Sequence, residues 1–153
     1  MSIEKLVYVA VLPLILAGCA TAKFGDKAVE ASLKKFQPIA DKVSLYVCRV
    51  DAFSGGGVGT EAFVNGKSIG ALKPKTFAHT ELPDGTISVF LRRNGIGVHS
   101  GDSGNLELTG KAGEVLIVWA GPAGAFIAPL TVDRFPTQAE GEACVKESSY
   151  AVP

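Results

Sequence analysis

The sequence has 153 residues, of which 47% are hydrophobic and 20% are charged, and 15 basic residues balance 15 acidic residues. A chain of this length is typical of one domain with a modest core. Its neutral balance removes the electrostatic argument for binding nucleic acid, whose phosphates attract basic surfaces, so we expect no nucleic-acid partner.

Residues 1–18 have the pattern of a bacterial secretory signal. Lys5 precedes an uncharged run from Leu6 to Leu16, and small residues follow at positions 17 and 18. A run of this length is too short to cross a bilayer, which requires about 20 helical residues, and Pro13 would interrupt a helix. An uncleaved membrane helix is therefore the weaker interpretation.

Cys19 directly follows Leu16-Ala17-Gly18, and this arrangement matches the bacterial lipobox. In a lipobox protein the signal is cleaved between Gly18 and Cys19, the cysteine thiol is diacylated, and the new amino group can also be acylated. Each buried acyl methylene contributes about 0.8 kcal/mol, so two or three chains make a firm membrane anchor. A plain signal peptide that ends near a cysteine is the alternative. Ala20, rather than Asp, follows the cysteine, which favours the outer membrane over the inner membrane.

Two further cysteines, Cys48 and Cys144, remain in the mature chain, in a compartment where disulfides persist. Pairing them would close a 96-residue loop, for which chain entropy gives somewhat less than about 4.7 kcal/mol. The alternative is that they are two buried free thiols. Their spacing has neither the CxxC form of a redox site nor the paired form of a zinc site.

Residues 19–42 are expected to comprise the lipidated cysteine, a spacer and a short helix. Asp26 is a suitable N-cap, and apolar residues then recur at helical spacing at positions 29, 33 and 36. We expect this helix to cover one end of the domain. The alternative is that it lies against the membrane interface.

From residue 43 to residue 136 the pattern changes to short strands separated by turn residues, which predicts a single all-β domain. Period-two alternation indicates sheets that are buried on one face, and two such faces pack into a β-sandwich; a partly open barrel is the alternative. Asn65-Gly66 is a strong hairpin signal. Seven strands are predicted, over residues 43–50, 60–64, 68–72, 76–82, 86–92, 105–109 and 114–119.

Several of these strand and turn patterns resemble a family of bacterial lipoproteins catalogued as a domain of unknown function, number 2846. The resemblance covers roughly residues 43–120. It departs from the family pattern at Asp84, which is inserted into a Pro-Gly turn, and at Leu116-Ile117, where aromatic residues are usual. The resemblance implies an envelope lipoprotein with an immunoglobulin-like or transthyretin-like sandwich, and it supplies no catalytic residues. The motifs that carry it are Tyr46-x-x-Arg49, Val64-Asn65-Gly66-Lys67-x-Ile69-Gly70-x-Leu72, Glu81-Leu82-Pro83-Asp84-Gly85-x-Ile87-x-Val89 and Ala112-Gly113-Glu114.

Residues that could carry catalysis are sparse. His99, Asp102 and Ser103 would serve for a hydrolytic site, but triads assemble from distant segments and require an oxyanion hole, so proximity in sequence is weak evidence. His79 and His99 with a carboxylate could bind zinc, but no ligand spacing supports it. We therefore expect no catalytic residues, no metal and no cofactor.

A charge-free segment of twelve residues, from Trp119 to Leu130, interrupts the strand pattern with small residues and two prolines. We expect it to fold into the core. The alternative is an exposed apolar partner surface that includes Trp119, Phe126 and Ile127. Residues 137–153 are expected to form a short helix over 138–147, capped by Thr137, and a tail.

These expectations combine into a lipid-anchored, non-enzymatic β-sandwich that acts as a binding or structural accessory module in the periplasm. Its partners would be the membrane, through acyl chains on Cys19, and another envelope protein or a glycan. Its expected location is the periplasmic face of the outer membrane. An envelope hydrolase acting on cell-wall or ester substrates is the alternative.

Overall fold

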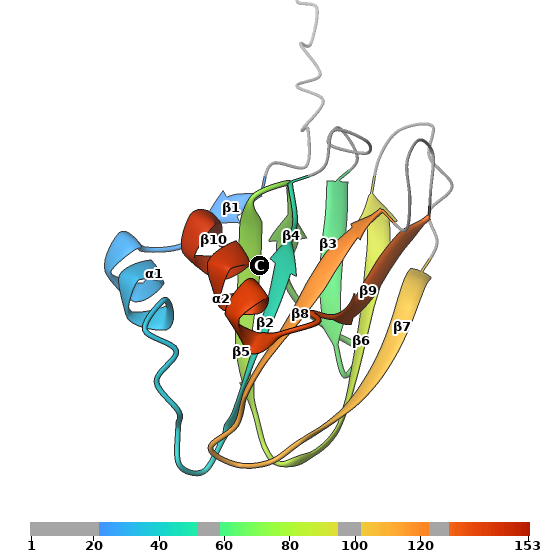
Figure 1. Ribbon diagram of the computed structural model, residues 1–153. Helices are drawn as coiled ribbons and strands as arrows, with labels where there is room; N and C mark the ends of the chain where they lie inside the picture. The colour runs from blue at the N-terminus through green and yellow to red at the C-terminus, as the bar shows by residue number, and fades with distance from the viewer. Residues whose placement is uncertain (1–21, 52–58, 95–101, 123–128) are drawn as a thin grey trace, which may run out of the picture.

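The computed structural model describes residues 22–51, 59–94, 102–122 and 129–153. Strands dominate these residues, and two short helices accompany them (Figure 1). The elements are β1 (Lys23–Phe24), α1 (Lys27–Leu33), β2 (Val43–Arg49), β3 (Gly59–Val64), β4 (Lys67–Leu72), β5 (Thr76–Leu82), β6 (Gly85–Asn94), β7 (Asp102–Gly110), β8 (Val115–Pro122), β9 (Leu130–Arg134), α2 (Gln138–Glu147) and β10 (Ser149–Val152).

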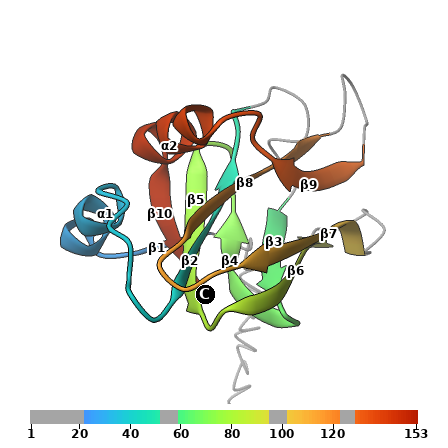
Figure 2. The same ribbon diagram turned by 60° about the horizontal axis from the view of Figure 1, so that its bottom comes forward.

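The strands form two sheets that pack face to face. One sheet has six strands in the order β1-β10-β5-β2-β8-β9, and the other has four strands in the order β4-β3-β6-β7. Most neighbours are antiparallel, but β2 runs parallel to β8, and β10 runs parallel to β5. Both helices lie on the six-stranded sheet, on the side turned away from the four-stranded sheet (Figure 2). The expected all-β sandwich is confirmed.

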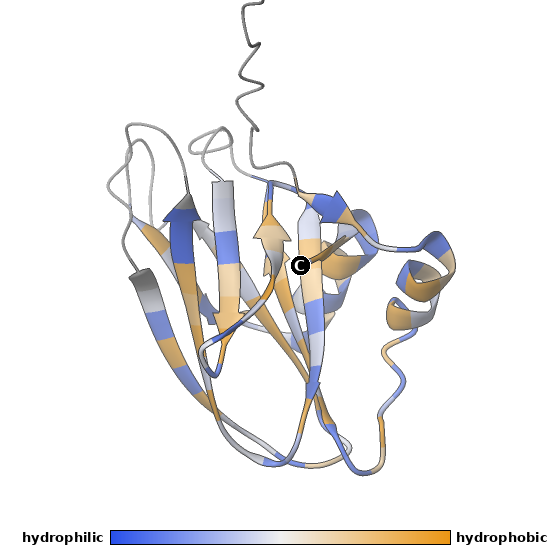
Figure 3. Cartoon of the chain, turned by 180° about the vertical axis from the view of Figure 1, so that it is seen from behind, coloured by the Kyte–Doolittle hydropathy of each residue, from blue (hydrophilic) through white to orange (hydrophobic). Residues whose placement is uncertain are grey.

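Alternation along β2 explains how one strand supports both layers. Val43, Leu45 and Val47 belong to the main core between the sheets. Tyr46 and Cys48 belong to a second cluster under the two helices. Every residue of β2 is buried, because one face of the strand packs against the other sheet and the opposite face packs against helices. Figure 3 shows the resulting bands of apolar and polar residues along the strands.

All seven strands expected from the sequence are present, but the described residues form ten strands, and β1, β9 and β10 were not predicted. The predicted Asn65-Gly66 turn joins β3 to β4, and both residues have positive φ angles, of 49° and 78°. This is the backbone geometry of a type I′ turn, whose twist matches that of the flanking strands. Local alternation and turn chemistry therefore determine most of the framework.

The expected C-terminal tail is wrong, because a strand forms after residue 147. The predicted helix α2 is present, with a capping box in which Glu140 N donates to Thr137 Oγ1 and Thr137 N donates to the Glu140 carboxylate. After α2 the chain continues as β10, which pairs with β5 on one side and β1 on the other. The C-terminal segment is thus an integral strand.

The spacer expected before the first strand is also much shorter than the sequence indicated. Lys23 and Phe24 already pair with Val152 and Ala151, so the sheet begins at residue 23. Asp26 caps α1 as predicted, by accepting hydrogen bonds from the amides of residues 28 and 29. Within the described part of the chain, no helix has the length and apolar character needed to cross a membrane.

Candidate functional site

The proposed anchoring residues lie outside the described part of the chain. These are Gly18 and Cys19, which the sequence assigns to signal cleavage and lipidation. The first described residue, Ala22, is three positions after Cys19 and is buried. Any lipid on Cys19 would therefore be attached very close to the folded domain.

Cys48 and Cys144 form a disulfide in the structure, with their sulfurs 2.08 Å apart. Cys48 is at the centre of the six-stranded sheet and is completely buried, whereas Cys144 lies on α2. The bond fastens α2 to β2, and α2 leads directly into β10. The C-terminal strand is thus tied to the middle of the sheet through the helix that precedes it.

Aromatic side chains surround this disulfide and fill the space under the helices. The Tyr46 ring centre lies 4.6 Å from that of His79 and 5.4 Å from that of Phe36. The Tyr46 hydroxyl donates a hydrogen bond of 2.9 Å to the carbonyl of Leu33, at the end of α1. Burial, followed by the charge of Glu81, raises the Tyr46 pKa to about 12. Tyr46 therefore acts as a neutral donor that holds α1 against the sheet.

His79 is partly buried and packs against Tyr46 beside this cluster, and its buried Nε2 atom has no hydrogen-bond partner among the described residues. Burial lowers the His79 pKa from 6.5 to about 4, because the apolar surroundings disfavour the charged imidazolium. A buried neutral imidazole without a carboxylate to orient it is a poor general base. We therefore assign His79 a packing role.

The low His79 pKa predicts a loss of stability in mild acid. Between pH 6.5 and about 4 the unfolded chain binds a proton at His79 and the folded chain does not, so the free energy of unfolding falls as pH falls. The loss attributable to His79 is up to about 3 kcal/mol across that interval. Urea titrations at several pH values should show a shallower decline for His79→Leu than for wild type. Parallel declines in the two proteins would contradict the assignment.

Most side chains of the alternative hydrolytic and zinc sites lie outside the part of the chain that the structure describes. His99 lies outside the described residues, and the side chains of Asp102 and Ser103 are also undescribed, although their backbone forms the start of β7. His79 lies on β5, in the other sheet. Within the described ranges, no three His, Cys, Asp or Glu side chains are grouped closely enough to hold a metal ion.

The two ends of the charge-free segment, residues 119–122 and 129–130, are described, and residues 123–128 between them lie outside the described part of the chain. Trp119 lies within β8 and is half-buried, on the face of the strand opposite to Val118 and Ala120. Phe126 and Ile127, the other two residues of the suggested partner surface, lie outside the described residues. Of the three suggested residues, only Trp119 is therefore placed, and the choice between a core segment and an exposed partner surface stays a prediction.

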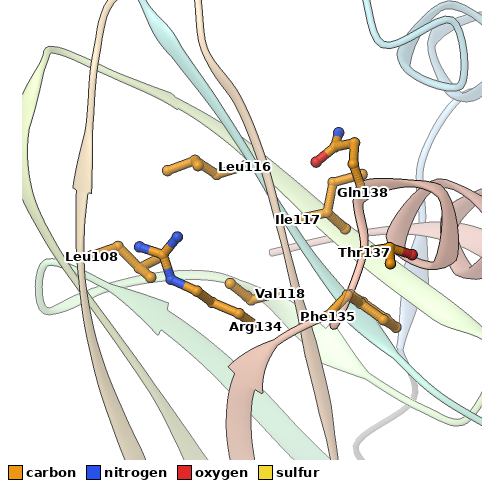
Figure 4. Close-up of a pocket in the computed structure, with 8 residues that line it drawn as sticks. All are labelled: Leu108, Leu116, Ile117, Val118, Arg134, Phe135, Thr137 and Gln138. Carbon is orange, nitrogen blue, oxygen red and sulfur yellow. The ribbon is translucent and has the colours of Figure 1, made fainter.

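A hollow that the sequence did not indicate lies where the two sheets separate, beside β8 (Figure 4). At Gly104 of β7 and Val132 of β9 the two strands are in close contact. A β-carbon added to Gly104 would lie only 2.6 Å from the amide nitrogen of Val132. Toward the start of β8 this contact ends, because β9 stops at Arg134, which pairs with Val118. Residues 115–117 of β8 therefore have no pairing partner in β9. The hollow is lined by Leu108, Leu116, Ile117, Val118, Arg134, Phe135, Thr137 and Gln138.

Arg134 gives this hollow its polar character. Its side chain reaches between Leu108 and Val118, and Gln138 lies across β8 from it (Figure 4). The Arg134 guanidinium makes no side-chain hydrogen bond or ion pair with any residue in the described ranges. An apolar floor, a stretch of strand edge that β9 does not pair with and an exposed guanidinium suit an extended segment that carries a carboxylate.

A second aromatic group covers the outer face of the four-stranded sheet. Phe63 and Phe90 are cross-strand neighbours whose rings stack 4.9 Å apart. The Arg92 guanidinium lies 4.5 Å from the Phe63 ring centre and 5.8 Å from that of Phe90. The domain's own arginine thus covers these rings, which makes them a poor platform for stacking a sugar.

Comparison with known proteins found no matching family model, curated protein or solved structure. The resemblance noted in the sequence therefore stays a prediction.

Proposed function

We propose that this protein is a bacterial envelope lipoprotein whose β-sandwich is a non-enzymatic binding or structural accessory module. It would be held by acyl chains on Cys19 at the periplasmic face of the outer membrane. The observation that carries this proposal is the Leu16-Ala17-Gly18-Cys19 motif after a short apolar run. The Cys48–Cys144 disulfide supports it, since such bonds persist in oxidising compartments.

The hollow beside β8 is the surface that we propose for the partner. A short extended segment of an envelope protein could pair with the edge of β8 and present a carboxylate to Arg134. A free edge of three residues offers few hydrogen bonds, so such a contact suits a partner that the shared membrane already keeps nearby. Membrane anchoring and partner binding would then depend on each other.

For the fold type, we propose the transthyretin-like variant of the two types that the resemblance implies. In an immunoglobulin constant domain the first two strands share a sheet. Here β2 and β3, the first two strands of the sandwich proper, belong to different sheets, and β2 instead lies between β5 and β8. This strand order supports the proposal.

Photocrosslinking in intact cells tests the proposed function. A photoreactive residue at Gln138, in the hollow, should join the protein to one discrete envelope partner. The same residue at Lys67, exposed at the opposite edge of the four-stranded sheet, should not. The Gln138 product should weaken strongly in a Cys19→Ser background, because the protein would leave the membrane.

Three results would contradict the proposal. Equal amounts of crosslinked product from Gln138 and Lys67 would show that the hollow is not the partner-binding surface. An undiminished Gln138 product in the Cys19→Ser background would show that partner binding does not depend on the lipid anchor. Hydrolysis of a cell-wall or ester substrate by the purified protein would overturn the non-enzymatic assignment.

A further inference from the structure

We infer that Lys23, Phe24, Lys27 and Val29, which we call the N-terminal patch, rest in the headgroup region of the bilayer. The domain would then lie against the membrane instead of hanging from it on a spacer. This inference rests on the proposed acylation of Cys19, and it goes beyond that proposal by assigning the membrane-facing surface.

The first step is the length of chain between the lipid and the sheet. From Cys19 to Lys23 there are four Cα–Cα steps of at most about 3.6 Å each, so the two α-carbons are separated by no more than roughly 14 Å. Burial of Ala22 against the domain shortens this reach further. A domain tethered this closely must keep the surface around β1 at the membrane.

The second step is the exposure of apolar side chains at this position. Phe24 is 60% exposed and Val29 is 46% exposed, and among the described residues these are the two large hydrophobic side chains left facing solvent. They lie five and ten positions after Cys19. β1, which carries Phe24, lies near one end of the sandwich, the upper end in Figure 1.

The third step is that the domain cannot turn these side chains inward. β1 is paired with β10, and Gly25 N donates a further hydrogen bond of 3.0 Å to the carbonyl of Tyr150. Glu30 of α1 is buried and accepts a hydrogen bond of 3.0 Å from Tyr150 N. Both elements are thus fixed to the C-terminal strand, and the exposure of Phe24 and Val29 is built into the fold.

The charge of this region also suits a lipid surface. Residues 22–35 contain four lysines and two acidic residues. One of the acids, Glu30, is shielded by Lys27 at 3.0 Å and Lys34 at 2.9 Å. Burial alone would raise the Glu30 pKa, but hydrogen bonds from Tyr150 N and the two lysines lower it to about 2, so it remains charged. Basic residues beside exposed apolar ones favour anionic headgroups.

The size of the patch favours a membrane over a protein partner. A stable protein interface buries about 1,200 to 2,000 Å² and centres on a fully desolvated core. Two separate apolar side chains cannot supply such a core. They are sufficient to enter the boundary between headgroups and acyl chains, where a firm lipid anchor already holds the domain.

Tryptophan quenching in vesicles tests the inference. Full-length lipidated Phe24→Trp is reconstituted into phosphatidylethanolamine–phosphatidylglycerol vesicles with and without bromine on the upper part of the acyl chains. The emission added by the new tryptophan, relative to wild type with Trp119 alone, should fall by roughly half in the brominated vesicles, since a residue at this boundary lies about 5–10 Å deep. Ala112→Trp, exposed in the turn before β8 at the other end of the sandwich, should lose none.

Each other outcome overturns the inference, and the outcomes separate its failure from that of the anchor. If the protein floats with the vesicles but the tryptophan at position 24 is not quenched, the patch does not contact lipid, although the anchor stands. A shift to shorter wavelength without bromine quenching would show that a second copy covers the patch. Equal quenching at positions 24 and 112 would show no fixed orientation. Failure of the protein to float would overturn both the anchor and the inference.

Discussion

Breaking the Cys48–Cys144 disulfide is expected to lower the free energy of unfolding by about 2 to 5 kcal/mol. The bond joins residues 96 positions apart, so it removes a large amount of chain entropy from the unfolded state. It also holds α2, and β10 after it, against the centre of the six-stranded sheet. A loss of this size is a large share of the stability of a domain of this length, which is typically about 5 to 15 kcal/mol.

Urea unfolding of wild type and of a Cys48→Ala/Cys144→Ala variant measures the effect. Reduced wild type is the matched control. Its free energy of unfolding should fall by a similar amount, because reduction breaks the same bond. Reduction also leaves the buried Cys48 side chain in place, so no cavity forms there. Two titratable thiols in unreduced, denatured protein would contradict the pairing. So would stability that reductant leaves unchanged.

Replacing Arg49 with alanine is expected to destabilise the domain by about 3 to 5 kcal/mol. Arg49 is 2% exposed, and its side chain points between the sheets from the end of β2. Its Nη1 donates hydrogen bonds of 2.9 Å to Thr60 Oγ1 on β3 and to the carbonyl of Leu72 on β4. Truncation would leave both acceptors without this donor and open a cavity between the sheets.

An Arg49→Met variant separates the two contributions. Methionine fills a similar volume and carries no charge into the interior, so its loss should be smaller than that of Arg49→Ala even though the same hydrogen bonds are gone. Denaturant unfolding of the three proteins provides the comparison. Equal stability of wild type and Arg49→Ala would show that the contacts to Thr60 and Leu72 do not join the sheets.

Arg49 also shows how far the sequence could lead. The Tyr46-x-x-Arg49 pattern belongs to the family resemblance, and its odd spacing places the two side chains on opposite faces of a strand. In the structure, Tyr46 holds α1 through the carbonyl of Leu33, and Arg49 links the two sheets through the carbonyl of Leu72. The acceptors lie on other strands, so no local pattern could identify them.

The same distinction explains which elements were predictable. The Asn65-Gly66 turn and the Thr137–Glu140 capping box are encoded within a few residues, so β3, β4 and α2 appear where they were expected. β1 and β10 have two and four residues, and they exist because they pair with each other and with β5. Such short strands carry no readable alternation, which is why the spacer and the tail were misjudged.

One part of the candidate site could also be predicted from the sequence, and the other part could not. The proposed lipobox is a contiguous motif, so the sequence alone is enough to predict it. The hollow beside β8 arises because β9 stops at Arg134 while β8 continues, and this depends on the register of two strands. The sequence suggests a partner surface in the charge-free segment from Trp119 to Leu130, and that suggestion stays a prediction. The exposed charge in the hollow comes instead from Arg134, on the next strand.

The intact mass of the mature protein, extracted from membranes, tests whether Cys19 carries the lipid anchor. We expect a chain that begins at Cys19 and is heavier than residues 19–153 by a diacylglycerol, with or without a further acyl chain. Cys19→Ser should lack this added mass and should leave the membrane fraction with its disulfide intact. A wild-type chain that retains Met1, or that begins at Cys19 with no added lipid mass, would show that the protein is not a lipoprotein anchored at Cys19.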